Sequence, residues 1–228
     1  MNNKNKSKDE NKRKKEIEFR ILASKGNALL DHEIIETFLS AVHDRAQARA
    51  IAKNLVTTCT GIGRILGREM DELKSIEGVT DSTVSMIFCV KETLTRVLKE
   101  ELKKVPILDN LGKLIEYLRV SIGYSDKENI TIMYLNQGCH LIGEEVFAGT
   151  VDQAPVYTRE IIKKALLKNT TSIVISHNHP GGSEKPSEAD KTMTKSLALA
   201  CHSVGIKFLD HIIITGDDYF SFRQNGLL

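Results

Sequence analysis

The stretch SHNHPGGSEKPSEAD occupies residues 176–190 and carries more chemical information than any other part of this chain. It begins where the apolar run Ser172–Ser176 ends, a run long enough for a buried strand and too short for a helix. His177 and His179 follow, two residues apart. Because side chains alternate along a strand, both point to the same side, and two imidazoles there can bind one metal ion at a Zn–N distance of about 2.0–2.1 Å.

A carboxylate completes the pattern. The Pro- and Gly-rich segment turns the chain back, and Asp190 lies in the first turn of a helix predicted from Ser187 to Ser203. Two histidines and one carboxylate leave the fourth tetrahedral position open, which is typical of a catalytic zinc site. Simpler explanations exist, because Ser187-x-x-Asp190 is also a capping box and a lone histidine near a strand end is usually a satisfied polar group. Together the residues favour a zinc ion (Zn2+) bound by His177, His179 and Asp190.

The segments around this stretch predict a mixed β-sheet with helices packed on it. The predicted elements are, in order, a helix from Asn110 to about Val120, strands Ile130–Leu135 and His140–Phe147, a helix from Thr158 to about Lys168, the strand Ser172–Ser176, the helix Ser187–Ser203, and strands Ile206–Thr215 and Tyr219–Phe222.

Residues 16–104 have the apolar spacing of helices instead. The expected features are helices capped by Asp31 and Asp44, an interruption at Gly61 and Gly63, a helix from about Arg68 to Ile76, a tight hairpin Ile76–Thr80, and a long helix from Ser82 to about Lys104. Pro106 disfavours helix at the residue before it, so residues 100–110 are predicted to be a linker. The sequence therefore predicts a helical domain over 16–104 and a second domain over 105–228.

The positive charge of the chain is concentrated at its start. The whole chain has a formal net charge of +2, whereas residues 1–15 alone contain seven Lys or Arg and two Asp or Glu. These residues include too few apolar side chains to fold alone, so we predict a disordered basic tail over 1–15. The remainder is net acidic, and no overall field indicates a nucleic-acid partner.

Composition also excludes several classes of protein. No apolar run approaches the roughly 20 residues that cross a bilayer, and the first residues lack the apolar segment of a secretory signal. The four cysteines are far apart and form no CxxC pair, which is typical of free thiols and not of a disulfide framework. We therefore expect a cytoplasmic protein with no membrane partner.

The HNHP sequence, a short loop and then SxxD resemble the JAMM (MPN+) metallopeptidase motif, with six residues instead of seven between Pro180 and Ser187. The segments GTVDQAPVYTREIIKKAL and LDHIIIT and the final Gly226-Leu-Leu are similar to the RadC family of bacterial proteins. The resemblance covers about residues 16–228 and is strongest from Glu128 onward. It implies an α+β chain, in which an all-helical helix-hairpin-helix-like domain precedes an α/β JAMM/MPN domain with a mixed β-sheet flanked by helices.

The resemblance also implies roles for individual residues. The two histidines and the aspartate of the JAMM motif bind zinc, and they correspond to His177, His179 and Asp190. The motif serine, here Ser187, helps to stabilise an oxyanion, and a glutamate before the first core strand, here Glu128, deprotonates the water that zinc activates. The implied activity is zinc-dependent hydrolysis of an amide bond in a protein or peptide of unknown identity.

Some positions differ from the RadC pattern or remain open. Asn136, Thr158 and Gly181 replace the usual aspartate, proline and serine, and none of them is a proposed ligand. Asp210-His211 matches the family, but a position beside the site and a purely structural role are both open, so we do not assign this pair to the site.

The hairpin supports an alternative function. It resembles a helix-hairpin-helix motif, in which two glycines let backbone amides approach a phosphate, but Thr80 replaces the second glycine and its Cβ obstructs that approach. A packing hairpin and a weak DNA contact through Gly78 and the basic tail both stay open. The alternative is thus a DNA-repair or DNA-processing accessory protein whose metal site is structural or inactive. A nucleic-acid hydrolase is a third hypothesis, although one zinc with three ligands fits amide hydrolysis better than two-metal phosphodiester chemistry.

Overall fold

A computed structural model describes residues 3–148 and 154–228, with side chains outside residues 1–10 and 149–157. The chain forms two compact units, residues 1–90 and 91–228. We predicted a boundary at 104–105 and a linker over 100–110, but the observed boundary lies inside helix α6 (Asp81–Lys103). Leu102 and Ile107 are buried in the core of the C-terminal unit, so the end of α6 and the segment after it belong to that unit.

A five-stranded mixed sheet organises the C-terminal unit, in the order β2-β1-β3-β4-β5. The strands are β1 (Asn129–Leu135), β2 (Leu141–Ala148), β3 (Ser172–Asn178), β4 (Lys207–Ile214) and β5 (Tyr219–Ser221). The central strand β3 pairs antiparallel with β1 and parallel with β4. Helix α9 (Glu188–Ser203) connects β3 to β4, as a parallel pair requires.

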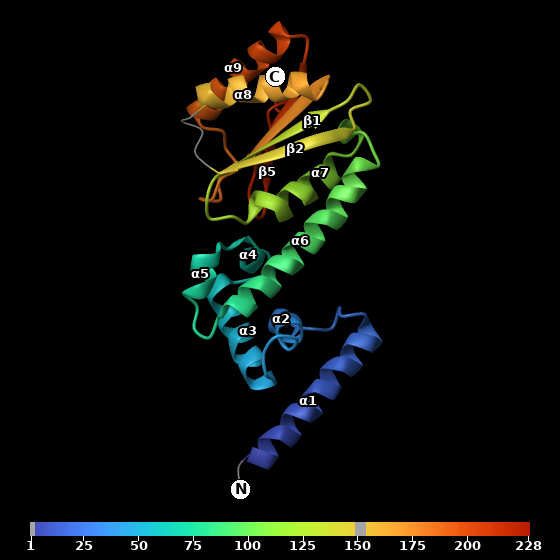
Figure 1. Ribbon diagram of the computed structural model, residues 1–228, viewed down its shortest axis with the longest axis vertical. Helices are drawn as coiled ribbons and strands as arrows, with labels where there is room; N and C mark the ends of the chain where they lie inside the picture. The colour runs from blue at the N-terminus through green and yellow to red at the C-terminus, as the bar shows by residue number, and fades with distance from the viewer. Residues whose placement is uncertain (1–2, 149–153) are drawn as a thin grey trace. The chain divides into compact units, whose positions relative to one another are not determined.

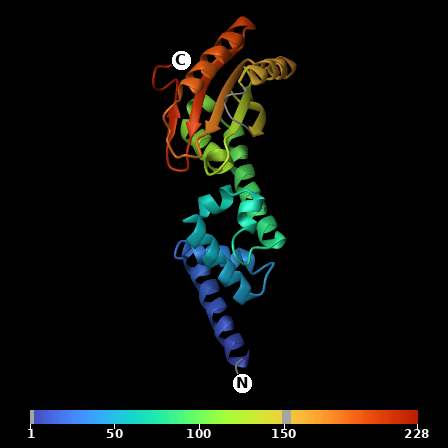
Figure 2. The same cartoon turned by 90° about the vertical axis from the view of Figure 1, so that its left-hand side faces the viewer.

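Helices cover both faces of this sheet (Figures 1 and 2). Helix α7 (Leu111–Leu118), followed directly by a π-helical turn at Arg119–Gly123, packs on one face. Helices α8 (Ala154–Leu167) and α9 pack on the other. The strands alternate between the two cores: on β1, Met133 and Leu135 face α7, whereas Ile130, Ile132 and Tyr134 face α8 and α9. The predicted mixed sheet with flanking helices is confirmed.

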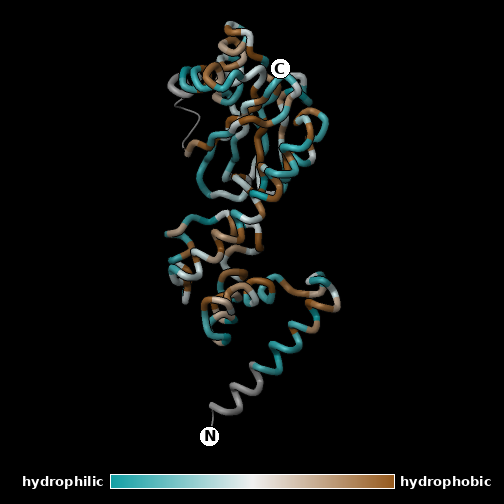
Figure 3. Tube along the Cα trace, turned by 45° about the vertical axis from the view of Figure 1, so that its right-hand side comes forward, coloured by the Kyte–Doolittle hydropathy of each residue, from teal (hydrophilic) through white to brown (hydrophobic). Residues whose placement is uncertain are grey.

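Brown, hydrophobic stretches run through the sheet in Figure 3, whereas the coloured part of α1 is mostly teal and hydrophilic. All seven residues of β3 are buried, as expected for a central strand with helices on both faces. Within the described ranges 3–148 and 154–228, no helix combines the length and hydropathy that a membrane span needs.

Local signals in the sequence set several helix starts. Asn110 caps α7 and Asp44 caps α3 (Arg45–Cys59), each through a side-chain oxygen that accepts a backbone N–H of the first turn. Helix α8 begins at Ala154, earlier than the predicted cap at Thr158. Pro155 suits this earlier start, because an N–H is not needed in the first turn of a helix. Residues 149–153 of the GTVDQAP motif lie outside the described residues.

The N-terminal unit is helical, as predicted. Its helices are α1 (Asn3–Ser24), α2 (Asp31–Leu39), α3, α4 (Ile62–Gly67), α5 (Met70–Lys74) and the first part of α6. Asp31 is the first residue of α2 and not its cap, and Gly63 lies inside α4. The predicted helix over 68–76 is shorter because the chain is extended at Arg68 and Glu69.

The basic segment at the start of the chain is helical in the structure. We predicted disorder over residues 1–15, but these residues belong to helix α1 from Asn3 onward. The guanidinium of Arg13 donates two hydrogen bonds to the Glu36 carboxylate, and the side chain of Ile17 is 7% exposed. Glu36, the partner of Arg13, lies on α2 and outside the basic segment, so the composition of that segment contains no information on this contact.

Candidate metal centre

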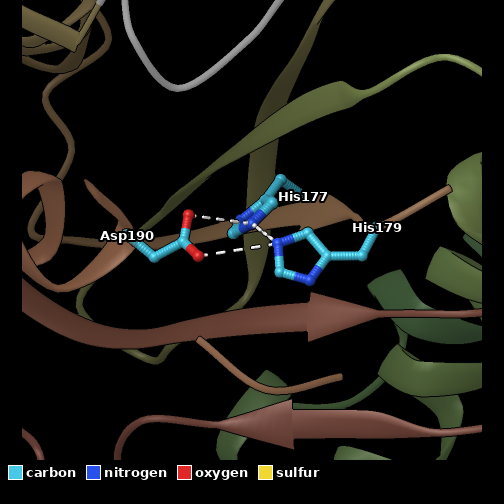
Figure 4. Close-up of side chains that lie close together, drawn as sticks. All are labelled: His177, His179 and Asp190. Carbon is cyan, nitrogen blue, oxygen red and sulfur yellow. Dashed lines mark hydrogen bonds and ion pairs between the residues drawn. The ribbon is translucent and has the colours of Figure 1, made fainter. Parts of the chain in front are cut away.

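The three predicted metal ligands converge beside the C-terminal end of β3. In Figure 4 the imidazoles of His177 and His179 and the carboxylate of Asp190 point toward one another. The two Nε2 atoms are 2.9 Å apart. Nε2 of His177 is 3.2 Å from Oδ1 of Asp190, and Nε2 of His179 is 3.5 Å from Oδ2. All three ligand atoms lie within 4.8 Å of one another, which is close enough for one ion to contact all of them.

The loop after the strand orients His179. The backbone N–H of Gly182 donates to the carbonyl oxygen of His179 at 3.0 Å and closes a turn over Pro180. Gly182 has a φ of +79°, a conformation that favours glycine. The turn brings the carbonyl oxygen of Ser183 to 2.7 Å from Nδ1 of His179. Since a carbonyl can only accept, Nδ1 carries the proton, and Nε2 of the neutral ring has a free lone pair toward Asp190.

Ser187 and Asp190 form the predicted capping box at the start of α9. The Ser187 hydroxyl oxygen accepts the backbone N–H of Asp190 at 3.1 Å. Oδ2 of Asp190 accepts two hydrogen bonds from Ser187, from its backbone N–H and from its hydroxyl, both at 2.7 Å. The box therefore fixes the orientation of the carboxylate, so the capping explanation and the metal explanation of this motif are compatible.

The charges at the site suit a cation. Burial alone raises the pKa of Asp190, but the nearby imidazoles of His177 and His179, together with the Ser187 hydroxyl, outweigh it and hold the pKa far below the ordinary value. The nearby Asp190 carboxylate raises the pKa of His179, against the effect of burial. Among the described residues, Oδ1 of Asp190 is a buried carboxylate oxygen that accepts no hydrogen bond. Two imidazoles and a carboxylate with such an oxygen are a donor set that fits zinc.

Glu128 lies at the edge of this cluster. It immediately precedes β1 and is half-buried. In the β1–β3 pairing Ile130 lies opposite His177, so Glu128 is two residues from the partner of a ligand. Asp190 is the main cause of the raised pKa of His179, and the negative charge of Glu128 contributes to it. The ligand cluster itself consists of the other three residues.

Asn178, between the two histidines, points to the opposite face and holds the segment that carries Glu128. Its Oδ1 accepts the backbone N–H of Asn129 at 2.7 Å. Its Nδ2 donates to the carbonyl oxygens of Ser125 and Lys127, both at 3.0 Å. The side chain of Asn178 is fully buried. We did not single out this residue in the sequence, because its partners become apparent only once β1 and β3 are paired.

His211, which the sequence left unassigned, lies directly behind His177. Its Nε2 is 2.8 Å from Nδ1 of His177. His211 is fully buried, and burial together with the neighbouring His177 holds its pKa well below the ordinary value, so the ring is neutral. In the sequence, the only sign of a role for His211 is that a histidine interrupts an apolar strand. Its position beside the site follows only from the parallel register of β3 and β4.

The hairpin at residues 76–80 is packed against its own unit. Gly78 has a φ of +84°, and a Cβ built there would lie 3.1 Å from Cγ1 of Ile51. The hydroxyl of Thr80 accepts the backbone N–H of Thr83 at 3.4 Å. This N–H at the start of α6 already has an acceptor within the chain. DNA contact through the hairpin and the basic segment stays a prediction.

Comparison with known proteins identifies the C-terminal unit. Residues 108–227 match the RadC-like JAB domain, and this match covers more than half of the chain. The chain belongs to the RadC-like JAB domain family. The matched segment contains all three residues of the ligand cluster as well as Glu128 and Ser187. The predicted family is therefore confirmed.

Relatives of this RadC-like chain extend beyond the matched domain. A UPF0758 protein of Fusobacterium nucleatum is 32% identical over 206 residues, which cover 87% of this chain and 89% of the relative. A UPF0758 protein of Nitrosomonas eutropha is 34% identical over 209 residues, 91% of this chain and 93% of the relative. One from Haemophilus ducreyi is 30% identical over 90% of this chain and 92% of the relative. The similarity thus includes the N-terminal helical unit.

Proposed function

We propose that this chain is a zinc-dependent hydrolase of the JAMM type that cleaves an amide bond in a protein or peptide. The observation that carries the proposal is the convergence of His177, His179 and Asp190, whose ligand atoms lie within 4.8 Å of one another. Membership of the RadC-like JAB domain family supports it, because the matched segment contains the whole cluster.

The ligand residues are prepared for a cation by their neighbours. His179 donates Nδ1–H to a backbone carbonyl and keeps Nε2 free, and Asp190 is ionised and oriented by the capping box. A zinc ion held by these residues supplies polarisation of a carbonyl oxygen and increases the acidity of water.

Glu128 is our candidate for the general base. One of its carboxylate oxygens accepts a proton from the water that attacks the amide carbonyl carbon. The same oxygen then returns the proton to the nitrogen that leaves as the amine. Ser187 is exposed, and in the present geometry its hydroxyl proton is given to Asp190. Rotation of that O–H bond would let it donate to the developing oxyanion instead.

The test compares wild type with Glu128→Gln, which removes the base and keeps the size of the side chain. Both proteins are loaded with zinc, their zinc content is measured, and new amino termini are counted after incubation with a proteome-derived peptide library. We expect equal zinc content and a rate about 10²–10⁴-fold lower for Glu128→Gln. The matched control is Glu116→Gln, which neutralises an exposed glutamate on α7 and should leave the rate unchanged.

Three outcomes would contradict the proposal. The first is a wild type that binds no more zinc than a His177→Ala variant, which is expected to lose it. Zinc-loaded wild type could release no amine, or Glu128→Gln could keep the full rate. A parallel incubation with single- and double-stranded nucleic acid tests the rival hypothesis of a nucleic-acid hydrolase. Cleavage of the nucleic acid without new amino termini would mean that the scissile bond is a phosphodiester and not an amide.

A further inference from the structure

Behind the candidate metal site, three hydrogen bonds form a continuous line that begins at one ligand and ends at another. Nδ1 of His177 is 2.8 Å from Nε2 of His211. Nδ1 of His211 is 2.6 Å from the hydroxyl oxygen of Thr194, and that hydroxyl donates to the backbone carbonyl of Asp190 at 2.6 Å. His177, His211 and Thr194 are at most 1% exposed. We call this line the His211 relay.

The direction of each hydrogen bond in the relay follows from the count of protons. The carbonyl of Asp190 has no proton, so Thr194 gives it the only proton of its hydroxyl. The Thr194 oxygen must then accept from Nδ1–H of His211. A neutral imidazole carries one N–H, so Nε2 of His211 is an acceptor, and its partner Nδ1 of His177 is the donor. Nε2 of His177 is therefore left without a proton on the side that faces Asp190 and His179.

We propose that His211 and Thr194 are positioning residues that hold His177 in the one neutral tautomer whose Nε2 can bind a metal. This inference rests on the metal site of the proposed function and adds residues to it that contact no substrate. In the other tautomer, Nε2 of His177 would carry a proton into the ligand cluster, and Nδ1 of His177 would have no proton to donate to Nε2 of His211, 2.8 Å away. The relay therefore favours the same tautomer that a metal between Nε2 of His177 and Nε2 of His179, which are 2.9 Å apart, requires.

The position of His211 is itself fixed by the segment after β4. The ring of Phe222 stacks on His211 with centroids 4.7 Å apart and planes 12° apart. Oδ1 of the buried Asp210 accepts the backbone N–H of His211 at 2.8 Å and that of Arg223 at 3.0 Å. The Asp210-His211 pair therefore has both of the roles that the sequence left open. Asp210 has the structural role, because it accepts two backbone N–H groups, and His211 lies beside the site, because it contacts His177.

The first test measures zinc affinity by competition with a chromophoric chelator. His211→Phe keeps an aromatic ring to stack on Phe222 but offers no acceptor, and we expect it to weaken zinc binding about 10–100-fold. His211→Gln restores an acceptor oxygen at a similar reach, and we expect affinity within a few-fold of wild type. Thr194→Val should weaken binding, and Thr194→Ser should restore it. His202→Gln, on the exposed end of α9, is the matched control and should bind as wild type does.

The second test needs no variant and so does not depend on how a substitution folds. Long-range ¹H–¹⁵N correlation spectra of the zinc-loaded protein report which nitrogen of His211 carries the proton. We expect the proton on Nδ1 of His211 and a bare Nε2. A proton on Nε2, or zinc binding by His211→Phe that equals wild type, overturns the relay while leaving the proposed function intact. A wild type that binds no zinc overturns both.

Discussion

Replacement of Asn178 by alanine should destabilise the C-terminal unit and slow the reaction through Glu128. The variant removes three hydrogen bonds, to the N–H of Asn129 and to the carbonyls of Ser125 and Lys127. Lys127 is exposed and water can replace its partner, whereas Ser125 is buried and Asn129 half-buried. At about 1–3 kcal/mol for each of these two groups left unpaired, the expected loss in free energy of unfolding is about 2–6 kcal/mol.

Asn136→Ala is the matched control for this prediction. Oδ1 of Asn136 also accepts two backbone N–H groups, those of Gly138 and His140, both at 3.0 Å. That turn joins β1 to β2 at the end of β1 away from Glu128, and its residues are accessible to water. We expect a loss of about 1 kcal/mol and an unchanged hydrolysis rate.

The assays are urea unfolding followed by circular dichroism and the amine-release rate at a temperature where each variant is folded. Asn178→Ala should unfold at lower urea than Asn136→Ala and turn over more slowly at equal zinc content. An isosteric second variant, Asn178→Asp, keeps the acceptor for Asn129 but directs a carboxylate at two carbonyls, and it should behave no better. The reasoning is refuted if folded, zinc-loaded Asn178→Ala hydrolyses at the wild-type rate, or if both alanine variants lose the same stability.

Three other predictions concern local contacts. Ser187→Ala removes the cap of α9 and the hydroxyl bonded to Asp190, and it should cost about 0.5–2 kcal/mol in thermal unfolding and weaken zinc binding in chelator competition. Leu55→Ala deletes a fully buried side chain in the N-terminal core and should cost about 2–5 kcal/mol in chemical unfolding; a smaller change would mean that the core closes around the deletion. The hydrogen bond from Arg20 lowers the pKa of Glu33, so the pair stabilises the fold above the ordinary glutamate pKa of about 4.3, and this contribution is lost as the pH falls through the lower folded value. Unfolding curves from pH 7 to pH 3 should therefore converge for wild type and Glu33→Gln at the acid end.

The ligand set could be predicted from the sequence because each of its signals is local. The spacing of His177 and His179 needs only the alternation of a strand, and Ser187 with Asp190 needs only the first turn of a helix. The helix caps Asp44 and Asn110 could be predicted for the same reason.

The remaining features depend on partners that are distant in sequence. Asn178 binds residues about 50 positions earlier, and His211 contacts His177 from 34 positions later, so the roles of both emerge only from the strand pairing. The helical state of residues 3–15 was missed because its anchor, Glu36, lies on another helix. Local composition contains no information on such contacts.

Because side chains alternate between the two faces along β3, the protein should tolerate insertions and deletions in some segments and not in others. Three successive residues alternate between the two faces of the sheet. His177 and His179 point to the ligand cluster on one face, and Asn178 points to the segment that carries Glu128 on the other. One inserted or deleted residue here would exchange the faces: a histidine would point to the segment before β1, and the amide would point to the ligand cluster. The turn after β1, at residues 136–140, is under no such constraint. We therefore expect natural and engineered length variants of this domain to accumulate in that turn, and the HNH tripeptide to admit none.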